Sequence, residues 1–256
     1  VRVLDKVNLK VDPRQTVGII GESGCGKSMM ALSIMGLVPI PPGRIAGGEI
    51  LYRGTDLLTL EKDAILDIRG KRIAMIFQEP MTSLNPVIRV GEQVAEPLMR
   101  HLRLSKKAAL AEAVELFRLV GIPAPDMRVR DYPHQLSGGM RQRAALIRTL
   151  AMEPDLLLLD EPFSALDYQT RLNVCDDIGK IIKKEGKTAI LVTHDISEAI
   201  SMADRVIVLA ARPAYVKKKI PIQFAMEERT PMKARSAPEF KTYFNAIWKE
   251  LDVHVS

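Results

Sequence analysis

Short apolar runs recur along the chain and predict buried β-strands. Several runs are continuous rather than alternating, which is typical of strands that are covered on both faces. The predicted strands span residues 7–11, 16–20, 49–52, 72–77, 155–159, 188–193 and 205–209. Helical spacing separates the later strands, and this alternation favours an α/β layered core with a mainly parallel sheet.

Local end signals support two of the predicted helices. The helix over residues 169–185 stops at Gly186, and Asp195 can cap a helix over residues 196–203. Both helices follow apolar runs, as the crossover connections of a parallel sheet do.

The pattern changes between residues 80 and 140. Apolar residues there take helical spacing, as in Leu110, Val114 and Phe117, in a segment that Ser105 can cap and Gly121 can end. We interpret this region as a helical subdomain inserted between two strands of the core. The predicted division is a core of residues 1–79 and 141–220, a helical subdomain of residues 80–140 and a C-terminal tail of residues 221–256.

The composition is ordinary for a soluble globular protein, with 47% apolar and 27% charged residues among 256. No apolar run approaches the roughly 18–20 residues that a membrane-spanning helix needs, and no secretory signal is visible. Cys25 and Cys175 are too few for a disulfide framework, so a reducing cytoplasm is expected. The formal charge of +6 is spread out without interleaved aromatic residues, which favours a solvated basic surface over nucleic-acid binding.

A glycine-rich loop follows the predicted strand 16–20 and precedes a helical pattern. It matches the phosphate-loop (Walker A) sequence in the strand–loop–helix context that gives the motif meaning. Its residues are Gly21, Glu22, Ser23, Gly24, Cys25, Gly26, Lys27 and Ser28. Backbone N–H groups and the helix N-terminus would bind the phosphates of ATP, with Lys27 at the β- and γ-phosphates and Ser28 on Mg²⁺. The alternative is a glycine-rich turn with a merely solvated Lys27.

Two carboxylates, Asp160 and Glu161, end the apolar strand 155–159. Ligands of α/β folds gather at the carboxyl ends of strands, where one carboxylate can hold Mg²⁺ and its neighbour can polarise the attacking water. The alternative is a strand that ends in a polar turn. Gln78 ends the strand 72–77 and is either a buried-edge amide or a ligand to metal and water. His194 follows the strand 188–193 and, taken alone, favours a structural role.

The triplet Ser137, Gly138 and Gly139 precedes an Arg-rich helical pattern. Locally it predicts a capped helix start. The same serine hydroxyl, glycine N–H groups and helix N-terminus also form an anion site. Alone, the triplet does not distinguish the two interpretations.

Together, in this order along residues 1–220, these motifs make the chain resemble the ATP-binding cassette (ABC) ATPases, the nucleotide-hydrolysing subunits of ABC transporters. The resemblance implies a P-loop core with a mainly parallel sheet, an antiparallel N-terminal β part and an inserted helical subdomain. It implies catalytic roles for Glu161, His194 and Gln78, and Mg²⁺ ligation by Ser28, Gln78 and Asp160. Ser137, Gly138, Gly139 and Asp167 would contact nucleotide as the signature and D-loop.

The resemblance also implies partners. Two cassettes of that family sandwich two ATP molecules, with the phosphate loop of one facing the Ser-Gly-Gly helix of the other. Transmembrane importer subunits bind the helical subdomain, which places the chain in the cytoplasm, peripheral on the inner face of the membrane. Two departures are Met140, where the family commonly has Gln, and the lack of an aromatic residue before Tyr52 for adenine stacking. Stacking contributes about 1–3 kcal/mol, so we expect weak nucleotide affinity.

The two halves resemble different branches of the family. Residues 1–150, and above all 74–86 and 132–140, resemble dipeptide and oligopeptide importer ATPases, whereas residues 152–256 resemble nitrate, sulfonate and taurine importer ATPases. One hypothesis is a composite cassette joined near residues 148–153, and the alternative is a single divergent importer ATPase. The helical subdomain lies in the peptide-like half, so a peptide importer is the first choice.

Other classes stay open from the sequence. A soluble ABC ATPase would usually carry a coiled-coil insertion or two cassettes, and neither is visible. A nucleotide-binding module without hydrolysis is the other alternative, although every catalytic position is filled. The transported substrate is not encoded in these residues.

Overall fold

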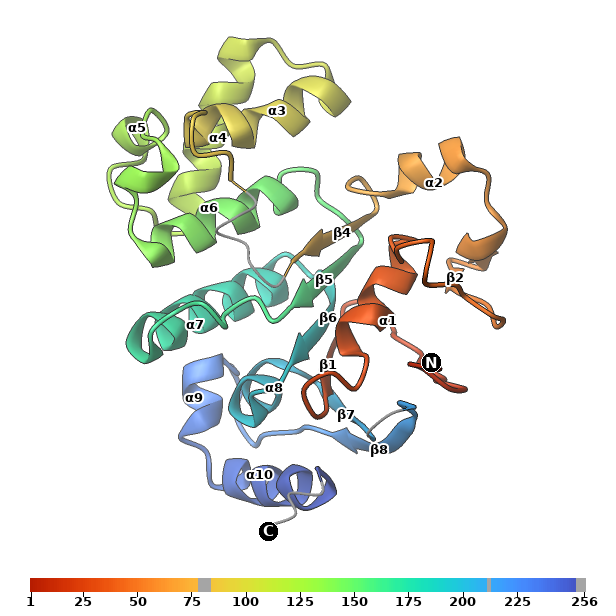
Figure 1. Ribbon diagram of the computed structural model, residues 1–256. Helices are drawn as coiled ribbons and strands as arrows, with labels where there is room; N and C mark the ends of the chain where they lie inside the picture. Colours follow the sequence, from red (N-terminus) through yellow and green to blue (C-terminus); the bar gives the residue numbers. More distant parts are fainter. Residues whose placement is uncertain (78–83, 211–212, 252–256) are drawn as a thin grey trace.

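The computed structural model describes residues 1–77, 84–210 and 213–251, and at its centre lies a six-stranded sheet. In spatial order the strands are β4 (Ile73–Ile76), β5 (Leu156–Asp160), β6 (Thr188–Thr193), β1 (Thr16–Ile20), β7 (Arg205–Leu209) and β8 (Val216–Pro221). All neighbours are parallel except β7 and β8 (Figure 1). The predicted α/β core with a mainly parallel sheet is confirmed.

Helices cover both faces of the sheet because its strands are apolar on both faces. In β5, Leu157 and Leu159 pack into a cluster with the helices α6 (Gly138–Leu150) and α7 (Tyr168–Lys184). Leu158 points to the opposite face, into a cluster that includes residues of α1 (Lys27–Ile34). Alternate side chains of one strand thus serve two layers, which explains the continuous apolar run.

The inserted region is helical, as predicted. Its elements are α3 (Val90–Leu102), α4 (Lys106–Leu119), α5 (Pro125–Arg128) and the short 3₁₀ turn η3 (Pro133–Gln135). Figure 1 shows α3, α4 and α5 together at one end of the molecule, beyond α6. Ser105 caps α4 by accepting a hydrogen bond from the Ala108 N–H at 3.3 Å, and Gly121 follows the helix end with a φ of +66°. The exact subdomain boundaries stay a prediction.

Two strand predictions are corrected, and one strand was missed. Residues 7–11 form no strand, and their apolar side chains pack partly buried against the α1 cluster without a paired neighbour in the described ranges. The strand 49–52 shortens to β2 (Leu51–Tyr52), which pairs with β3 (Thr55–Asp56) around a turn whose central residues both have positive φ. The antiparallel N-terminal part is therefore this hairpin. Strand β8 was not predicted, because three consecutive lysines interrupt its apolar pattern.

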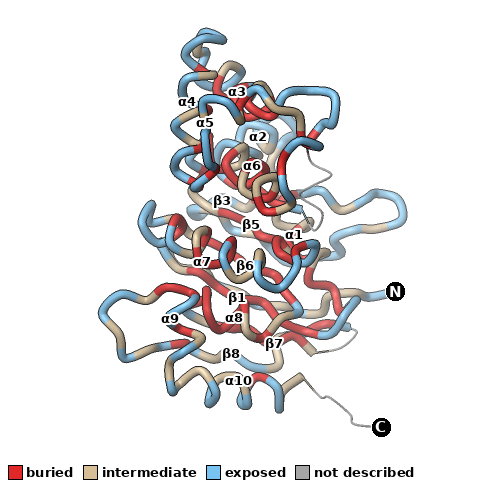
Figure 2. The backbone as a smooth tube through the Cα atoms, turned by 90° about the vertical axis from the view of Figure 1, so that its left-hand side faces the viewer, coloured by how far each residue is buried: buried red, intermediate tan, exposed pale blue. Residues whose placement is uncertain are grey.

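The segment between β3 and β4 contributes two further elements, the 3₁₀ turn η1 (Leu57–Thr59) and helix α2 (Lys62–Ile68). Leu57 is buried, whereas α2 has no buried residue. Figure 2 shows that buried residues concentrate along the strands and the inner sides of the covering helices, with exposed backbone at the periphery. None of the helices in the described part of the chain combines the length and apolarity that a bilayer crossing requires.

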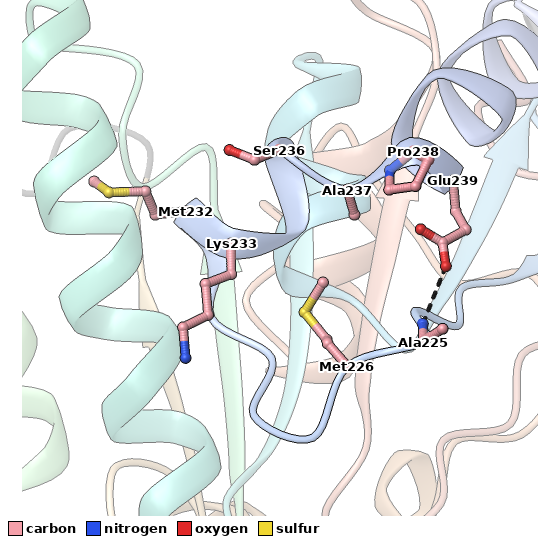
Figure 3. Close-up of a pocket in the computed structure, with 8 residues that line it drawn as sticks. All are labelled: Ala225, Met226, Met232, Lys233, Ser236, Ala237, Pro238 and Glu239. Atoms are coloured by element: carbon pink, nitrogen blue, oxygen red, sulfur yellow. Dashed lines mark hydrogen bonds between the residues drawn. The ribbon is translucent and has the colours of Figure 1, made fainter.

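The C-terminal tail forms two ordered helices, α9 (Pro231–Arg235) and α10 (Pro238–Glu250). Ile247 of α10 is fully buried against a cluster that includes α8 (Ile196–Met202). A hollow of about 490 Å³ lies between α9, the start of α10 and the preceding loop (Figure 3). At its edge Glu239 accepts a hydrogen bond from the Ala225 N–H at 3.1 Å. The tail thus packs on the core rather than extending from it.

Arg229 fastens this tail to the C-terminal end of α8. Its Nη2 donates to the carbonyl oxygens of Ile200 at 2.8 Å, Ser201 at 3.3 Å and Ala203 at 2.6 Å. These carbonyls lie at the helix end, where peptide oxygens lack partners within the helix and the macrodipole favours a cation. The Arg229 guanidinium also lies 4.9 Å from the centre of the Phe224 ring.

Candidate functional site

The loop between β1 and α1 has the closed form that the glycine pattern predicts. Lys27 is buried, and its Nζ donates to the carbonyl oxygens of Gly21 and Glu22, each at 2.9 Å. Glu22, Ser23 and Gly24 form the exposed rim. The ammonium group is therefore held inside the curl of the loop instead of lying in solvent, which contradicts the interpretation of a merely solvated lysine.

Two of the glycines are required by close approach. A Cβ at Gly21 would lie 2.8 Å from the Cys25 Sγ and 3.0 Å from a backbone oxygen of Leu209. Gly26 has a φ of +113°, and a Cβ there would lie 2.8 Å from Val3. The Cys25 side chain is itself buried, so it fills the underside of the loop. Side chains at these positions would push the loop open and disrupt the phosphate cradle.

Ser28 and Asp160 meet at the base of this loop. The Ser28 Oγ donates to the Asp160 Oδ1 at 3.0 Å, so two of the three predicted Mg²⁺ ligands are neighbours. Burial raises the pKa of Asp160, and the hydrogen bond from Ser28 opposes that effect. A hydroxyl and a carboxylate oxygen are ligands that suit Mg²⁺. In the described ranges no group of three or more His, Cys, Asp or Glu residues could hold a metal, so further oxygen ligands would have to come from elsewhere.

Glu161 and His194 are in direct contact. The His194 Nδ1 lies 3.1 Å from the Glu161 Oε2, and the Glu161 side chain is mostly buried while that of His194 is more than half exposed. Glu161 takes the left-handed region with a φ of +46°, and its N–H donates to the Val192 carbonyl at 2.8 Å. Such strained backbone in a non-glycine residue is concentrated at functional sites.

The sheet order explains why these groups meet. Strands β5, β6 and β1 are adjacent and parallel, so their carboxyl ends lie along one edge. Asp160 and Glu161 end β5, His194 follows β6, and the phosphate loop follows β1. The sequence-predicted groups from all three strands are thereby brought together. Gln78 lies outside the described residues.

The Ser-Gly-Gly triplet starts α6 as predicted. The Ser137 Oγ accepts a hydrogen bond from the Met140 N–H at 3.3 Å, which is a helix cap. A Cβ at Gly139 would lie 2.8 Å from the Thr170 Cγ2, so this glycine allows α6 to approach α7 closely. Asp167 caps α7 by accepting from the Thr170 N–H at 3.0 Å, and this contact lowers the pKa of Asp167. The triplet and Asp167 therefore lie at adjacent helix starts.

A polar group behind His194 was missed by sequence reasoning. The Thr193 Oγ1 donates to the Glu198 Oε2 at 2.6 Å, and both side chains are buried. Burial raises the pKa of Glu198. Asp195, predicted to cap α8, accepts from the N–H groups of Ser197 at 2.7 Å and Glu198 at 3.1 Å. The sequence offered one signal for this group. Glu198 lies three residues after the cap Asp195, yet it falls among the apolar residues of α8 that face the core.

Comparison with known proteins identifies the group to which these features belong. The family model described as "ABC transporter" matches residues 4–164. The chain is similar to the oligopeptide transport ATP-binding protein OppD of Bacillus subtilis, with 46% identity over 211 residues, 82% of this chain and 59% of the relative. It is 46% identical over 197 residues to the dipeptide transport ATP-binding protein DppD of the same organism, covering 77% of this chain and 59% of the relative. The chain thus spans about six tenths of the length of these curated relatives.

A solved structure shares the fold. The dimeric structure of a post-hydrolysis state of the ATP-binding cassette MJ0796, bound to ADP and Pi, matches with a TM-score of 0.73 and 30% identity. The match covers 86% of this chain and 91% of that chain.

Proposed function

This chain belongs to the ABC transporter family, and from that premise we propose that it is the ATP-hydrolysing subunit of a peptide importer. The observation that carries the proposal is the contact between Glu161 and His194 beside the phosphate loop. It places a mostly buried carboxylate and a histidine, 3.1 Å apart, at the same sheet edge as the buried Lys27. Relatives named for oligopeptide and dipeptide transport support the peptide class.

Nucleotide binding would use the loop from Gly21 to Ser28. The Lys27 ammonium group is held by two backbone carbonyl oxygens. When ATP binds, it would contact the β- and γ-phosphate oxygens instead and neutralise part of their negative charge. Ser28 and Asp160 would hold Mg²⁺, together with Gln78. The bound metal would neutralise negative charge that develops on the phosphates during transfer.

Hydrolysis would depend on Glu161. Its carboxylate would orient a water molecule and accept its proton. Two observations support this role: Glu161 has a left-handed backbone, and its Oε2 lies 3.1 Å from the His194 Nδ1. His194, with its exposed ring, would contact the γ-phosphate side of the same site. Both assignments rest on the ordered motifs together with this geometry.

A second cassette would complete the site. The MJ0796 cassette is described as a dimer bound to ADP and Pi. By the same arrangement, Ser137, Gly138 and Gly139 of one chain would contact the nucleotide held by the partner's phosphate loop. Asp167 would lie at the dimer interface. The exposed position of Asp167 at the start of α7 is consistent with such a contact.

Transmembrane importer subunits would dock on the face that carries Phe77. A hollow of about 330 Å³ lies between the end of β4, α3 and α6, and its lining includes Phe77, Pro97, His101 and Thr149. Phe77 is 46% exposed, which is high for a phenylalanine. A helix of a membrane subunit is the occupant we propose, and it would hold the chain on the cytoplasmic face of the membrane.

The composite origin stays a hypothesis. The alignment with OppD covers 211 residues of this chain, so at least 211 − 152 = 59 of them lie beyond residue 152. Peptide-transport relatives therefore match part of both halves, which favours the single-cassette alternative. Separate searches with residues 1–148 and 153–256 test the point: a nitrate or sulfonate importer ATPase as the best match of the second segment alone would support the composite.

Phosphate release with Mg²⁺-ATP tests the proposed activity. Glu161→Gln should bind ATP yet hydrolyse it at least about tenfold more slowly, because an amide accepts no proton from water. Glu112→Gln, on the exposed side of α4, is the matched control and should keep the parent rate. Light scattering should show a nucleotide-bound dimer of Glu161→Gln. Equal rates in Glu161→Gln and the parent would refute the role of this carboxylate.

A further inference from the structure

We propose that Arg171 is a positioning residue that holds the segment 164–167 and His194 in register with each other. The proposal rests on the proposed ATPase function, since it concerns the same site. Arg171 lies in the first turn of α7, and its side chain is 24% exposed. In the described part of the chain, its side-chain hydrogen bond and ion pairs go to Leu166, Asp195 and Glu198.

One side of the guanidinium binds the segment before α7. The Arg171 Nη2 donates to the Leu166 carbonyl at 3.0 Å. That segment is continuous with the candidate catalytic carboxylate, because the Ser164 Oγ and the Ser164 N–H donate to the Glu161 carbonyl at 3.0 and 3.2 Å. The Leu166 N–H in turn donates to the Phe163 carbonyl at 3.2 Å. A shift of Arg171 would therefore displace residues 161–166.

The other side of the guanidinium faces two carboxylates that frame His194. The Arg171 Nη1 lies 3.7 Å from the Asp195 Oδ2, and the Arg171 Nε lies 3.9 Å from the Glu198 Oε1. The other oxygen of each carboxylate accepts a hydrogen bond from a residue next to His194 or at the start of α8. The Asp195 Oδ1 caps α8, and the Glu198 Oε2 accepts from the Thr193 Oγ1. The cation thus binds the two groups that fix the turn carrying His194.

These contacts form a closed network of hydrogen bonds and ion pairs. The network links Glu161 through residues 164–166 to Arg171, and Arg171 through Asp195 and Glu198 to the turn that carries His194. The His194 Nδ1 in turn lies 3.1 Å from the Glu161 Oε2. The Arg171 Nε is buried and has no hydrogen-bond partner among the described residues, so the guanidinium is held by attraction to Glu198 across a gap about 1 Å longer than a hydrogen bond. Only a planar fork reaches the carbonyl and both carboxylates at once, which is why lysine is not equivalent here.

Single-turnover hydrolysis in a double-mutant cycle tests the inference. Arg171→Met should lower the rate about 10–100-fold, since misplacement of about 1 Å can reduce catalysis by that factor. In a His194→Ala background the same substitution should lower the rate by a smaller factor, because the part of its effect that passes through His194 is already lost and only the part that passes through residues 161–166 remains. Arg171→Lys should fall between Arg171→Met and the parent.

Arg229→Met is the control for a purely structural effect, because it also loosens α8 but at the opposite end from His194. Its effect should be the same factor in both backgrounds. If Arg171→Met lowers the rate by equal factors with and without His194, or leaves it unchanged, the inference is wrong.

Hydrogen exchange separates this inference from the proposed function. If the parent hydrolyses ATP no faster than Lys27→Ala, the ATPase proposal fails, and the exchange measurement then decides the role of Arg171. Arg171→Met should raise amide exchange in peptides covering 163–168 and 193–198 together, whereas Arg229→Met should raise it in α8 and the C-terminal tail without a matching rise in 163–168. Unchanged exchange in both segments of Arg171→Met would overturn the inference whatever the ATPase result.

Discussion

Replacing Arg229 by methionine should destabilise the whole chain by releasing its C-terminal tail. Methionine keeps much of the apolar stem but removes every donor. Two of the lost hydrogen bonds are short, at 2.8 Å to Ile200 and 2.6 Å to Ala203, and both leave carbonyl oxygens at the end of α8 without that partner. Hydrogen bonds from a charged donor contribute about 1.5–3 kcal/mol each.

The net loss is smaller than the sum of these contacts. Burial lowers the pKa of Arg229, because removal from water disfavours the charged form and offsets part of the hydrogen-bond gain. The contact of the guanidinium with the Phe224 ring stabilises the folded chain by roughly 0.5–2 kcal/mol, and this contribution is lost as well. We therefore expect a loss of about 3 kcal/mol in the free energy of unfolding, which lowers Tm by roughly 6–12 °C in a chain of this size.

Thermal unfolding followed by circular dichroism measures this shift. Arg118→Met is the matched control, because Arg118 is more than half exposed and its ion-pair partners among the described residues are the exposed carboxylates of Glu115 and Asp126. Its Tm should move by about 2 °C or less, since surface ion pairs contribute about 0–1 kcal/mol. A Tm of Arg229→Met within 2 °C of the parent would refute the view that this residue fastens the tail.

Three further outcomes are expected. Lys27→Ala should abolish ATP binding in titration calorimetry, because the loop loses the cation for the β- and γ-phosphates; unchanged affinity would contradict the phosphate-loop assignment. Gly139→Ala should lower stability by about 1–3 kcal/mol through the contact with the Thr170 methyl group, and Thr170→Ser in the same chain should restore part of it in denaturant titration; no restoration would locate the strain elsewhere. Scanning calorimetry should show one cooperative transition, and two transitions separated near residue 150 by proteolysis would mean that the halves form independent cores.

Much of the fold was predictable because the local signals were strong. The strands 16–20, 188–193 and 205–209 were predicted with their observed bounds, since each is a continuous apolar run between polar turns. The helix caps at Ser105, Ser137 and Asp195 follow from their short polar side chains before helical patterns. The phosphate loop was equally clear, because its glycines and lysine have fixed spacing.

Other features depend on contacts that no local pattern encodes. Strand order is one, because β4 and β1 are separated in space by strands from much later in the chain. The left-handed φ of Glu161 is another, since nothing in the sequence marks a glutamate for that conformation. Arg171 and Arg229 are ordinary surface-type residues by composition, and only the fold shows that they join distant segments.

The order of strands in the sheet also determines when the protein can fold during its synthesis. Strand β1 pairs with β6 and β7, and Thr16 lies opposite Ala189, 173 residues later. At about 5–20 residues per second, the ribosome adds those residues in roughly 9–35 s. Throughout that interval β1, whose five residues are all buried in the folded chain, has neither neighbour available, and β4, the other early strand, is not adjacent to it. During that interval the nascent chain therefore presents an unpaired strand rich in valine and isoleucine, which makes it a natural client for chaperones that shield such segments.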